Sequence, residues 1–416
     1  MSQFDTLSIF CCGTNFSRDN LDEAVAHTYD ICKGRKWIND GPGNRAHPIL
    51  KTENILKKID NPKYTKYLSG KDVHGEKSKG KRSLFANKID IEDKYNHWFQ
   101  SANKGSMGGK GTADNVITTI QWLWEQYWAT QIDEQKAGRR PEPTFKTINL
   151  VGWSRGAVTC TMIAHAIAEA GFAKLIPNLS VNIFAFDPVP GGANDFGTKN
   201  ANFDKTGRIG STETLPRIVN YYTAVLMENL DGSNFYRSLF KNTSQPSIEK
   251  TNRPFTGQHS GTYIREIPFP GSHGDAVMYK KPDNPSGHIS IHLCHQFLLN
   301  NGTELARPTQ LSDKELLEEY STARIKWADP GDASKKVAPT KYRKDLVFNW
   351  MRDNNLFINM HHLDIFKKQL PEVWEAMSGN KTLNEFQIKR LEVSYPKTYQ
   401  TLVISNHIDS LTGVSA

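Results

Sequence analysis

Residues 152–156 read Gly-Trp-Ser-Arg-Gly and place a serine between two glycines. An apolar run, 148–151, leads into this pentapeptide, and an alanine-rich stretch, 157–170, follows it directly. We expect a strand, a sharp turn and a helix, with glycines at the turn because a Cβ there would collide with the neighbouring elements. The turn would expose Ser154 beside a helix N-terminus, whose N–H groups favour a developing negative charge. The pattern predicts a serine nucleophile; the competing interpretation is a serine that only caps the helix.

Two further residues could activate this serine. Asp187 ends an apolar run, 181–186, and precedes a loop rich in proline and glycine, a position where α/β sheets build their sites. His273 follows a second strand-like run, 262–268. Serine, acid and histidine then occur in the chain order typical of α/β-hydrolases. A histidine can take the serine proton near neutral pH and return it to a leaving alcohol, while a carboxylate fixes the imidazole tautomer.

Each position has competitors in the sequence. His259 or His288 could serve as the base, and Asp195 or Asp275 could replace the acid. Asp275 is more readily interpreted as a brace for its own loop. Cys12 is an alternative nucleophile, although a buried cysteine is usually inert.

A tetrahedral intermediate needs backbone N–H donors for its oxyanion. Arg155, directly after the nucleophile, is expected to supply one donor. The turn formed by Gly13 and Thr14, after a strand-like run at 7–12, is expected to supply the other.

Three histidines raise the alternative of a metal site. His288, His292 and His295 share one face of an expected helix, 287–299. No acidic or thiolate set nearby completes the ligand shell, so packing and capping are the favoured interpretation.

The remaining periodicity predicts an α/β fold with an α/β-hydrolase-like, mostly parallel sheet and helices on both faces. We expect a hydrolase domain over 1–310 and a helical C-terminal region over 311–416. The other expected elements are helices at 18–32, 112–130, 312–326, 341–352, 364–377 and 382–395, and a strand at 218–223.

Residues 35–111 show little periodicity and are expected to form a basic insertion over the face of the sheet. Residues 51–110 hold fourteen Lys and Arg against seven Asp and Glu. A solvated face is the favoured interpretation, and docking to an anionic membrane surface is the alternative. The formal net charge of +8 over 416 residues is too small to indicate a nucleic-acid partner.

The five cysteines lack metal or framework spacing, which indicates reduced thiols made in a cytosol. The N-terminus has no basic segment followed by an apolar stretch, so we expect no ordinary signal peptide. No run of 18 apolar residues occurs, and we expect no membrane span.

Three stretches resemble motifs of the DUF2235 family, which includes the catalytic domain of Tle1-type type VI secretion phospholipase effectors. They are residues 152–157, 186–189 and 269–275, and the last, Phe-Pro-Gly-Ser-His-Gly-Asp, is the most specific. The Gly13–Thr14 turn also resembles the opening block of the family, with Cys12 in place of its aspartate. Residues 224–229 weakly resemble a family helix.

By this resemblance Ser154 is the nucleophile, Asp187 the orienting acid and His273 the base. The implied activity is hydrolysis of acyl esters, those of glycerophospholipids in particular, through an acyl-enzyme and without a metal or cofactor. The implied setting is a bacterial effector, made in the cytoplasm and exported by a signal-peptide-independent route, with a secretion-apparatus or immunity partner. An esterase for a soluble or protein-borne ester, or a binding module on a hydrolase scaffold, are the alternatives.

Overall fold

The computed structural model describes residues 5–42, 112–136, 138, 145–189, 215–228, 256–259, 261–326 and 356–412. These residues contain a seven-stranded sheet in the order β2-β1-β3-β4-β5-β7-β6. All neighbouring strands are parallel except β6 and β7. The predicted α/β fold with a mostly parallel sheet is confirmed. The strands are β1 (Thr6–Cys11), β2 (Arg35–Asn39), β3 (Thr147–Trp153), β4 (Ser180–Phe186), β5 (Val219–Glu228), β6 (Thr256–His259) and β7 (Thr262–Pro270).

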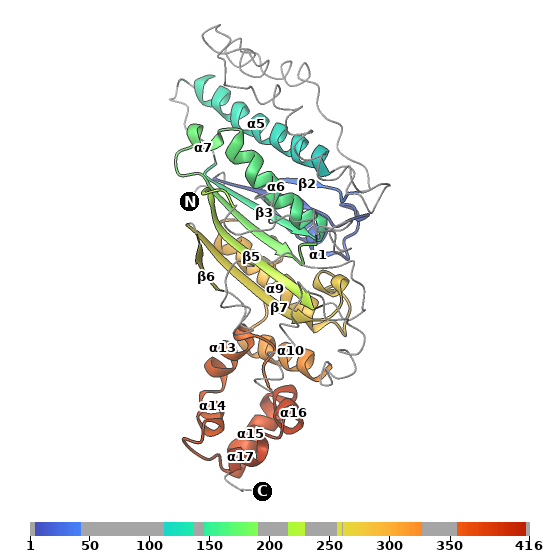
Figure 1. The fold of residues 1–416 in the computed structure, drawn as a ribbon, viewed down its shortest axis with the longest axis vertical. Helices are drawn as coiled ribbons and strands as arrows, with labels where there is room; N and C mark the ends of the chain where they lie inside the picture. Colours follow the sequence, from blue (N-terminus) through green and yellow to red (C-terminus); the bar gives the residue numbers. More distant parts are fainter. Residues whose placement is uncertain are drawn as a thin grey trace, which may run out of the picture.

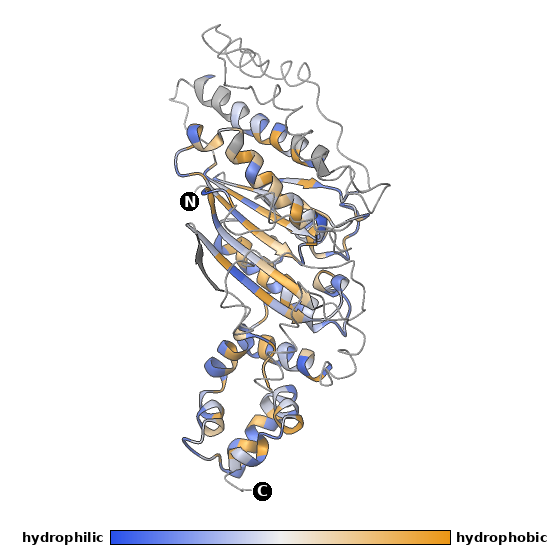
Figure 2. Ribbon diagram, in the orientation of Figure 1, coloured by the Kyte–Doolittle hydropathy of each residue, from blue (hydrophilic) through white to orange (hydrophobic). Residues whose placement is uncertain are grey.

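Helices cover both faces of the sheet (Figure 1). One face packs against α5 (Thr112–Lys136), α6 (Arg155–Glu169) and α7 (Phe172–Leu175). The opposite face packs against α1 (Ala24–Ile31), α9 (Pro285–Asn300) and α10 (Asp313–Lys326). The sheet therefore separates two buried cores, which accounts for the concentration of apolar residues on the central strands in Figure 2.

The order of the strands reverses between β1 and β3. From β1 the chain adds β2 on one side, and after α5 it returns to add β3 on the other side. Helix α1 accordingly lies on one face of the sheet, whereas α5 and α6 lie on the opposite face. Open α/β sheets bind ligands beside the carboxyl ends of the strands at such a switch point.

The first strand of the expected insertion belongs to the sheet. Arg35–Asn39 forms β2, which pairs along its length with β1, so the prediction of an irregular segment from residue 35 onward is wrong for these residues. The Lys36 ammonium donates to the carbonyls of Tyr29 and Cys32, each at 2.7 Å, and thereby provides hydrogen-bond donors for carbonyls at the C-terminal end of α1. The rest of the expected insertion lies mostly outside the described residues.

Residues 224–228 are part of β5, so the weak resemblance of 224–229 to a family helix was misleading. The side chains of Ala224, Val225, Leu226 and Met227 are all at most 2% exposed. A strand buried on both faces reads as a continuous apolar run, which periodicity cannot distinguish from a buried helix.

Helices at the C-terminal end pack on α10, where Ser321 Oγ lies 2.9 Å from Thr398 Oγ1. The single helix expected at 364–377 is broken at Leu370, because Pro371 lacks an N–H and disfavours helical backbone before it. The helix expected at 341–352 lies outside the described residues. The C-terminal helices are α13 (Met360–Gln369), α14 (Pro371–Met377), α15 (Glu385–Ser394), α16 (Pro396–Ile404) and α17 (Ile408–Thr412).

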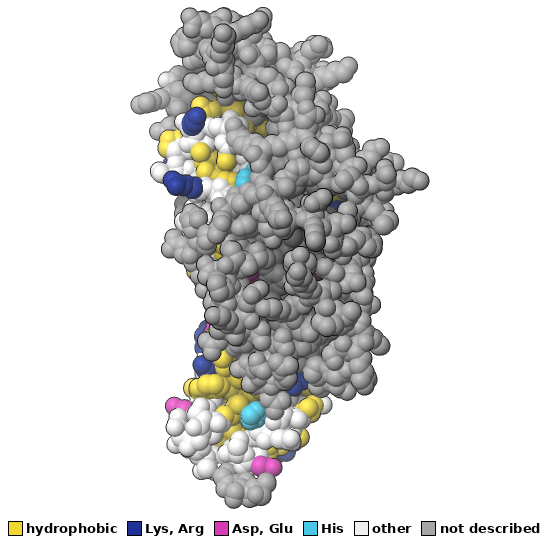
Figure 3. Space-filling view, viewed as in Figure 1, with side chains coloured by type: hydrophobic (Ala, Val, Ile, Leu, Met, Phe, Trp, Pro, Cys, Tyr) yellow, Lys and Arg dark blue, Asp and Glu magenta, His cyan; other side chains and the backbone are white. Residues whose placement is uncertain are grey.

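Several apolar side chains of these helices face solvent. Phe386 and Val393 lie seven residues apart on α15 and are 77% and 69% exposed, and Val403 and Ile404 of α16 are nearly half exposed. Figure 3 shows hydrophobic side chains at the surface of this end of the molecule. Among the described residues, no helix is both long and apolar enough to cross a membrane.

The histidines of α9 cap and pack neighbouring segments. His292 Nδ1 accepts the Leu311 N–H at 2.9 Å, and His295 Nδ1 accepts the Thr309 N–H at 2.7 Å. His295 Nε2 also lies 3.1 Å from Thr28 Oγ1 on α1. No group of three side chains that could hold a metal occurs in the described ranges. These contacts support the packing interpretation over the metal site.

We predict that His295 makes the fold sensitive to acid. Burial, with a smaller contribution from His27 and His292, lowers the pKa of His295 from 6.5 to about 3. The unfolded chain therefore binds a proton below pH 6.5 that the folded chain does not, so stability falls as the pH drops from 6.5 towards 3. In urea unfolding, His295→Gln should reduce this dependence by ~1.4 kcal/mol per pH unit.

His288→Gln is the matched control. In the wild-type protein, the hydrogen bond from His288 to Glu319 raises the pKa of His288. This histidine therefore adds stability at low pH, and the contribution is lost only above pH 6.5. The control should leave the dependence below pH 6.5 unchanged. A full wild-type dependence in His295→Gln would contradict the prediction.

Candidate active site

Ser154 lies at the junction of β3 and α6, as the sequence predicts. Its backbone adopts φ 56° and ψ −125°, an unfavourable conformation for a residue with a Cβ. Its side chain makes no capping hydrogen bond to α6, which counts against the interpretation of Ser154 as a helix cap. The residue is 6% exposed and follows the last residue of β3. A strained serine whose hydroxyl is not used by its own helix is the arrangement that a nucleophile requires.

The start of α6 lies directly against the end of β1. A Cβ added to Gly156 would lie 2.1 Å from the Cys11 carbonyl oxygen and 2.5 Å from that of Cys12. A Cβ on Gly152 would lie 2.5 Å from the Gly156 oxygen. Only glycine fits at either position, which gives the physical reason for both glycines of the turn.

Asp187 follows β4 and is fully buried. Its Oδ1 accepts the N–H of Met227 at 2.9 Å, and its Oδ2 lies 2.6 Å from His273 Nδ1. The backbone of Asp187 also has a positive φ of 38° and is held by the Val225 carbonyl, which accepts its N–H at 2.7 Å. Both carboxylate oxygens are thus engaged, and a buried acid is oriented towards the histidine.

His273 begins the 3-10 turn η4 (His273–Ala276) after β7 and is 6% exposed. Its ring stacks on that of Trp153, with centroids 5.3 Å apart, so the residue before Ser154 packs against the expected base. Asp275 Oδ2 accepts the N–H and the hydroxyl of Ser272, at 2.8 and 2.9 Å, and closes a capping box. Asp275 therefore braces the loop of the histidine.

The structure thus joins Asp187 and His273 directly, and it connects the Ser154 backbone with the same region, because the Ser154 N–H donates to the Phe186 carbonyl at 3.0 Å and Trp153 stacks on His273. Within the described residues, no hydrogen bond connects the Ser154 hydroxyl with His273. Hydrogen bonds between a catalytic hydroxyl and its base are often long without substrate and shorten in the Michaelis complex.

The two expected oxyanion donors come from the start of α6 and from the segment after β1. Arg155 opens α6, and its carbonyl accepts the Thr159 hydroxyl at 2.8 Å. Gly13 follows β1 and contacts the indole of Trp153, where an added Cβ would lie 2.3 Å from the ring. Thr14, next in the chain, is partly exposed. The Gly13–Thr14 turn and the first turn of α6 are therefore neighbours.

The competing residues fit the chemistry less well. Burial, then the charges of Glu23 and Asp40, raises the pKa of the Cys12 thiol well above its ordinary value, which disfavours the nucleophilic thiolate. Both ring nitrogens of His288 are occupied, by Glu319 at 3.2 Å and by the Lys281 carbonyl at 3.0 Å. The side chain of His259 and all of Asp195 lie outside the described residues.

The sequence did not indicate two contacts of this site. The Met227 N–H reaches Asp187 from the neighbouring strand β5, and the Trp153 ring stacks on His273. Trp153, next to the serine, was visible in the sequence. Its contact with His273 could not be predicted, because it depends on where the end of β7 lies in the folded protein. Met227 contributes only its backbone N–H to this contact, so its residue type gives no signal.

No family model and no curated protein matches this sequence. A crystal structure of an uncharacterized protein from Pseudomonas aeruginosa aligns with 98% of this chain and 63% of its own, at 11% identity and a TM-score of 0.41. A Tle1 effector bound to the VgrG spike of the type 6 secretion system aligns with 65% of this chain and 50% of its own, at 18% identity and a TM-score of 0.22. The chain spans less than two thirds of either structure. Similarity to a Tle1 effector is thus partial and weak, and membership of DUF2235 stays a prediction.

We predict that Gly156→Ala destabilises the fold. The added methyl would meet two backbone carbonyls of β1 and the following residue, which cannot rotate away. Overpacking of this kind costs ~1–3 kcal/mol or more of unfolding free energy, measurable by urea denaturation.

Gly34→Ala provides the comparison, because a Cβ there meets nothing within 4 Å. Equal stability of the two variants would show that α6 and β1 can separate without cost.

Proposed function

We propose that this protein is a serine hydrolase that cleaves acyl esters, with Ser154 as nucleophile, His273 as base and Asp187 as the orienting acid. The contact of 2.6 Å between the buried Asp187 carboxylate and His273 Nδ1, beside a strained serine, carries the proposal. This contact joins residues from the ends of two strands, and Ser154 follows a third strand, β3, so the chain order is the one expected for such a site.

The geometry supports a defined division of roles. Asp187 holds the Nδ1–H tautomer, which leaves Nε2 of His273 as the proton acceptor. Ser154 Oγ attacks the ester carbonyl and forms the acyl–oxygen bond while its proton passes to Nε2. The imidazolium then protonates the leaving alcohol as the ester bond breaks. Water, deprotonated by the same nitrogen, hydrolyses the acyl-enzyme and regenerates the serine.

We further propose glycerophospholipids as the substrate class. The support is the resemblance of residues 269–275 and 186–189 to the motifs of phospholipase effectors. The exposed Phe386 and Val393 of α15 fit peripheral contact with a membrane, since an apolar helix face can enter the interface of a bilayer. Export by a signal-peptide-independent effector route, with a partner in the secretion apparatus, belongs to the same proposal.

Ser154→Ala should abolish hydrolysis, because the acyl-enzyme cannot form. Wild-type protein should release fatty acid from phospholipid vesicles and alcohol from a short soluble ester. The variant should lose ~10³-fold or more on both substrates. Ser378→Ala, which removes an exposed hydroxyl at the end of α14, serves as the control.

The two substrates separate the alternatives. Wild-type turnover of the short ester alone would favour an esterase for a soluble substrate. No turnover of either by wild-type protein would favour a binding module. Full activity of Ser154→Ala would exclude Ser154 as the nucleophile.

Asp187→Asn should lower kcat by ~10⁴-fold, because the amide favours the wrong imidazole tautomer. Asp275→Asn, which weakens only the capping box, should lower kcat far less than Asp187→Asn does. The measurement is kcat on the short ester, with circular dichroism to confirm folding. An equal loss in both variants would indicate that the loop, and not the acid, limits the rate.

A further inference from the structure

The segment after β1 carries the second expected oxyanion donor and is held in place from β2. Residues 13–20 contain turns and no helix or strand. The Gly13 carbonyl accepts the Phe16 N–H at 3.0 Å, which closes a tight turn around Thr14. Such a turn fixes its own shape, but its position over the nucleophile depends on contacts with other elements.

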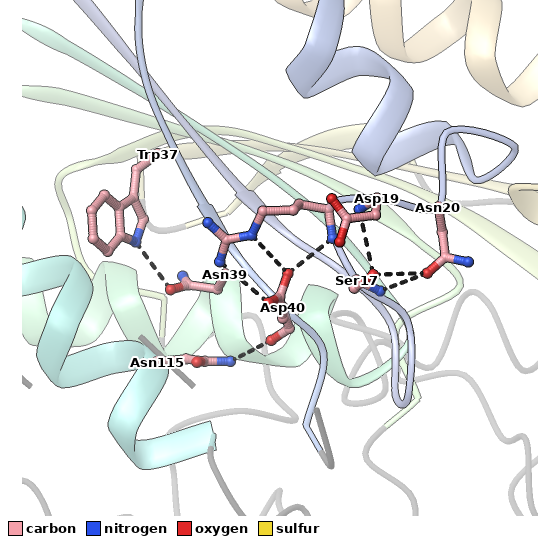
Figure 4. Close-up of polar contacts among 8 residues, drawn as sticks. Ser17, Asp19, Asn20, Trp37, Asn39, Asp40 and Asn115 are labelled. Atoms are coloured by element: carbon pink, nitrogen blue, oxygen red, sulfur yellow. Dashed lines mark hydrogen bonds and ion pairs between the residues drawn. The ribbon is translucent and has the colours of Figure 1, made fainter. Parts of the chain in front are cut away.

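An ion pair fixes one end of this segment. The Asp40 carboxylate, directly after β2, accepts three N–H groups of Arg18 (Figure 4). Oδ1 accepts the backbone N–H at 2.9 Å and Nε–H at 3.1 Å, and Oδ2 accepts Nη2–H at 3.2 Å. Asp40 is 8% exposed, so the pair is shielded on its acidic side. A planar guanidinium that binds both oxygens fixes direction as well as distance.

Backbone hydrogen bonds between the two segments lie closer to the site, and together with the ion pair they form a clamp. Gly41 donates to the Phe16 carbonyl at 2.8 Å, and Asn15 donates to the Pro42 carbonyl at 3.1 Å. The two segments lie so close that a Cβ on Gly41 would lie 1.6 Å from the Gly13 oxygen.

Helix α5 holds the other side of the clamp. Asn115 Nδ2 donates to the Asp40 carbonyl at 2.9 Å, a contact also shown in Figure 4. Asn39, the residue before Asp40, donates to Thr119 Oγ1 of the same helix at 2.8 Å. Helix α5 thus fixes the backbone at Asp40, the residue whose carboxylate binds Arg18.

Aromatic contacts connect the clamped turn with the catalytic residues. The Phe16 ring meets Trp153 edge-on, with centroids 4.7 Å apart, and Trp153 stacks on His273. A shift of the segment would therefore move the wall of the site as well as the Gly13–Thr14 donor.

We propose that Arg18 and Asp40 are positioning residues, which set the Gly13–Thr14 turn at the distance that the oxyanion requires. The inference rests on the proposed hydrolase function. The pair touches no reacting atom and acts through the backbone of the turn. Stabilisation of an oxyanion is lost when a donor moves by a fraction of an ångström, whereas binding of the neutral ester depends little on that donor.

The test uses Asp40→Asn and Arg18→Lys in the full chain. Both should lower kcat on a short ester by ~10- to 100-fold and change KM by less than about twofold. Arg18→Lys keeps the charge but loses the two-pronged geometry, and it also serves where Asp40→Asn folds poorly. A trifluoromethyl ketone, whose adduct with the serine carries an oxyanion, should lose affinity in parallel with kcat/KM.

Asp22→Asn is the matched control. Asp22 lies two residues after this segment and forms an ion pair with Lys280 at 2.8 Å, but its side chain is 82% exposed. Exposed pairs contribute little, so this variant should keep kcat within about twofold of wild type.

The outcomes separate this inference from the proposed function. Normal kcat in folded Arg18→Lys and Asp40→Asn, with Ser154→Ala inactive, would overturn the positioning role alone. A rise in KM at constant kcat would also overturn it, since the pair would then serve substrate binding. Activity in Ser154→Ala would remove the proposed function and, with it, the premise of the inference.

Discussion

No side chain fits between the first turn of α6 and the end of β1. This contact between backbones, at Gly156 against the carbonyls of Cys11 and Cys12, restricts the position of Ser154, the proposed nucleophile. The chain leaves β3 through Ser154, a residue with a positive φ of 56°. The conformational strain is supported by the two cores of the sheet, which hold β1 and β3 in register from residue 6 to residue 11.

The buried acid follows from a second constraint. A carboxylate without solvent contact needs a partner for each oxygen, and Asp187 finds one in the Met227 N–H and the other in His273. The first partner is a backbone N–H of the adjacent strand β5, which holds the acid independently of the histidine. The orientation of the histidine is therefore supported by the sheet, and its loop is held by the capping box at Ser272 and by the Asn284 amide, which donates to the Asp275 carbonyl at 2.9 Å.

The local part of the site could be predicted from the sequence, because strand, glycine turn and helix are contiguous in residues 148–170. The acid and the histidine were predictable as ends of strands, although their contact could not be derived from spacing. Arg35–Asn39 escaped prediction because a short edge strand with two basic residues shows no alternation until β1 supplies its partner. The ion pair between Arg18 and Asp40 depends on that same pairing of strands and could not be inferred from a separation of 22 residues.

Because the strand order reverses between β1 and β3, the strands on either side of β3 support different parts of the site. On one side, β2 and β1 hold the Gly13–Thr14 turn through Asp40 and Gly41, and under the proposed function this turn faces the developing negative charge. On the other side, β4, β5 and β7 hold the acid and the histidine. Ser154 lies between the two sides, since β3 pairs with both β1 and β4. In the proposed reaction, separate strands therefore support charge stabilisation and proton transfer, and the ring contacts of Trp153 with Phe16 and His273 connect the two.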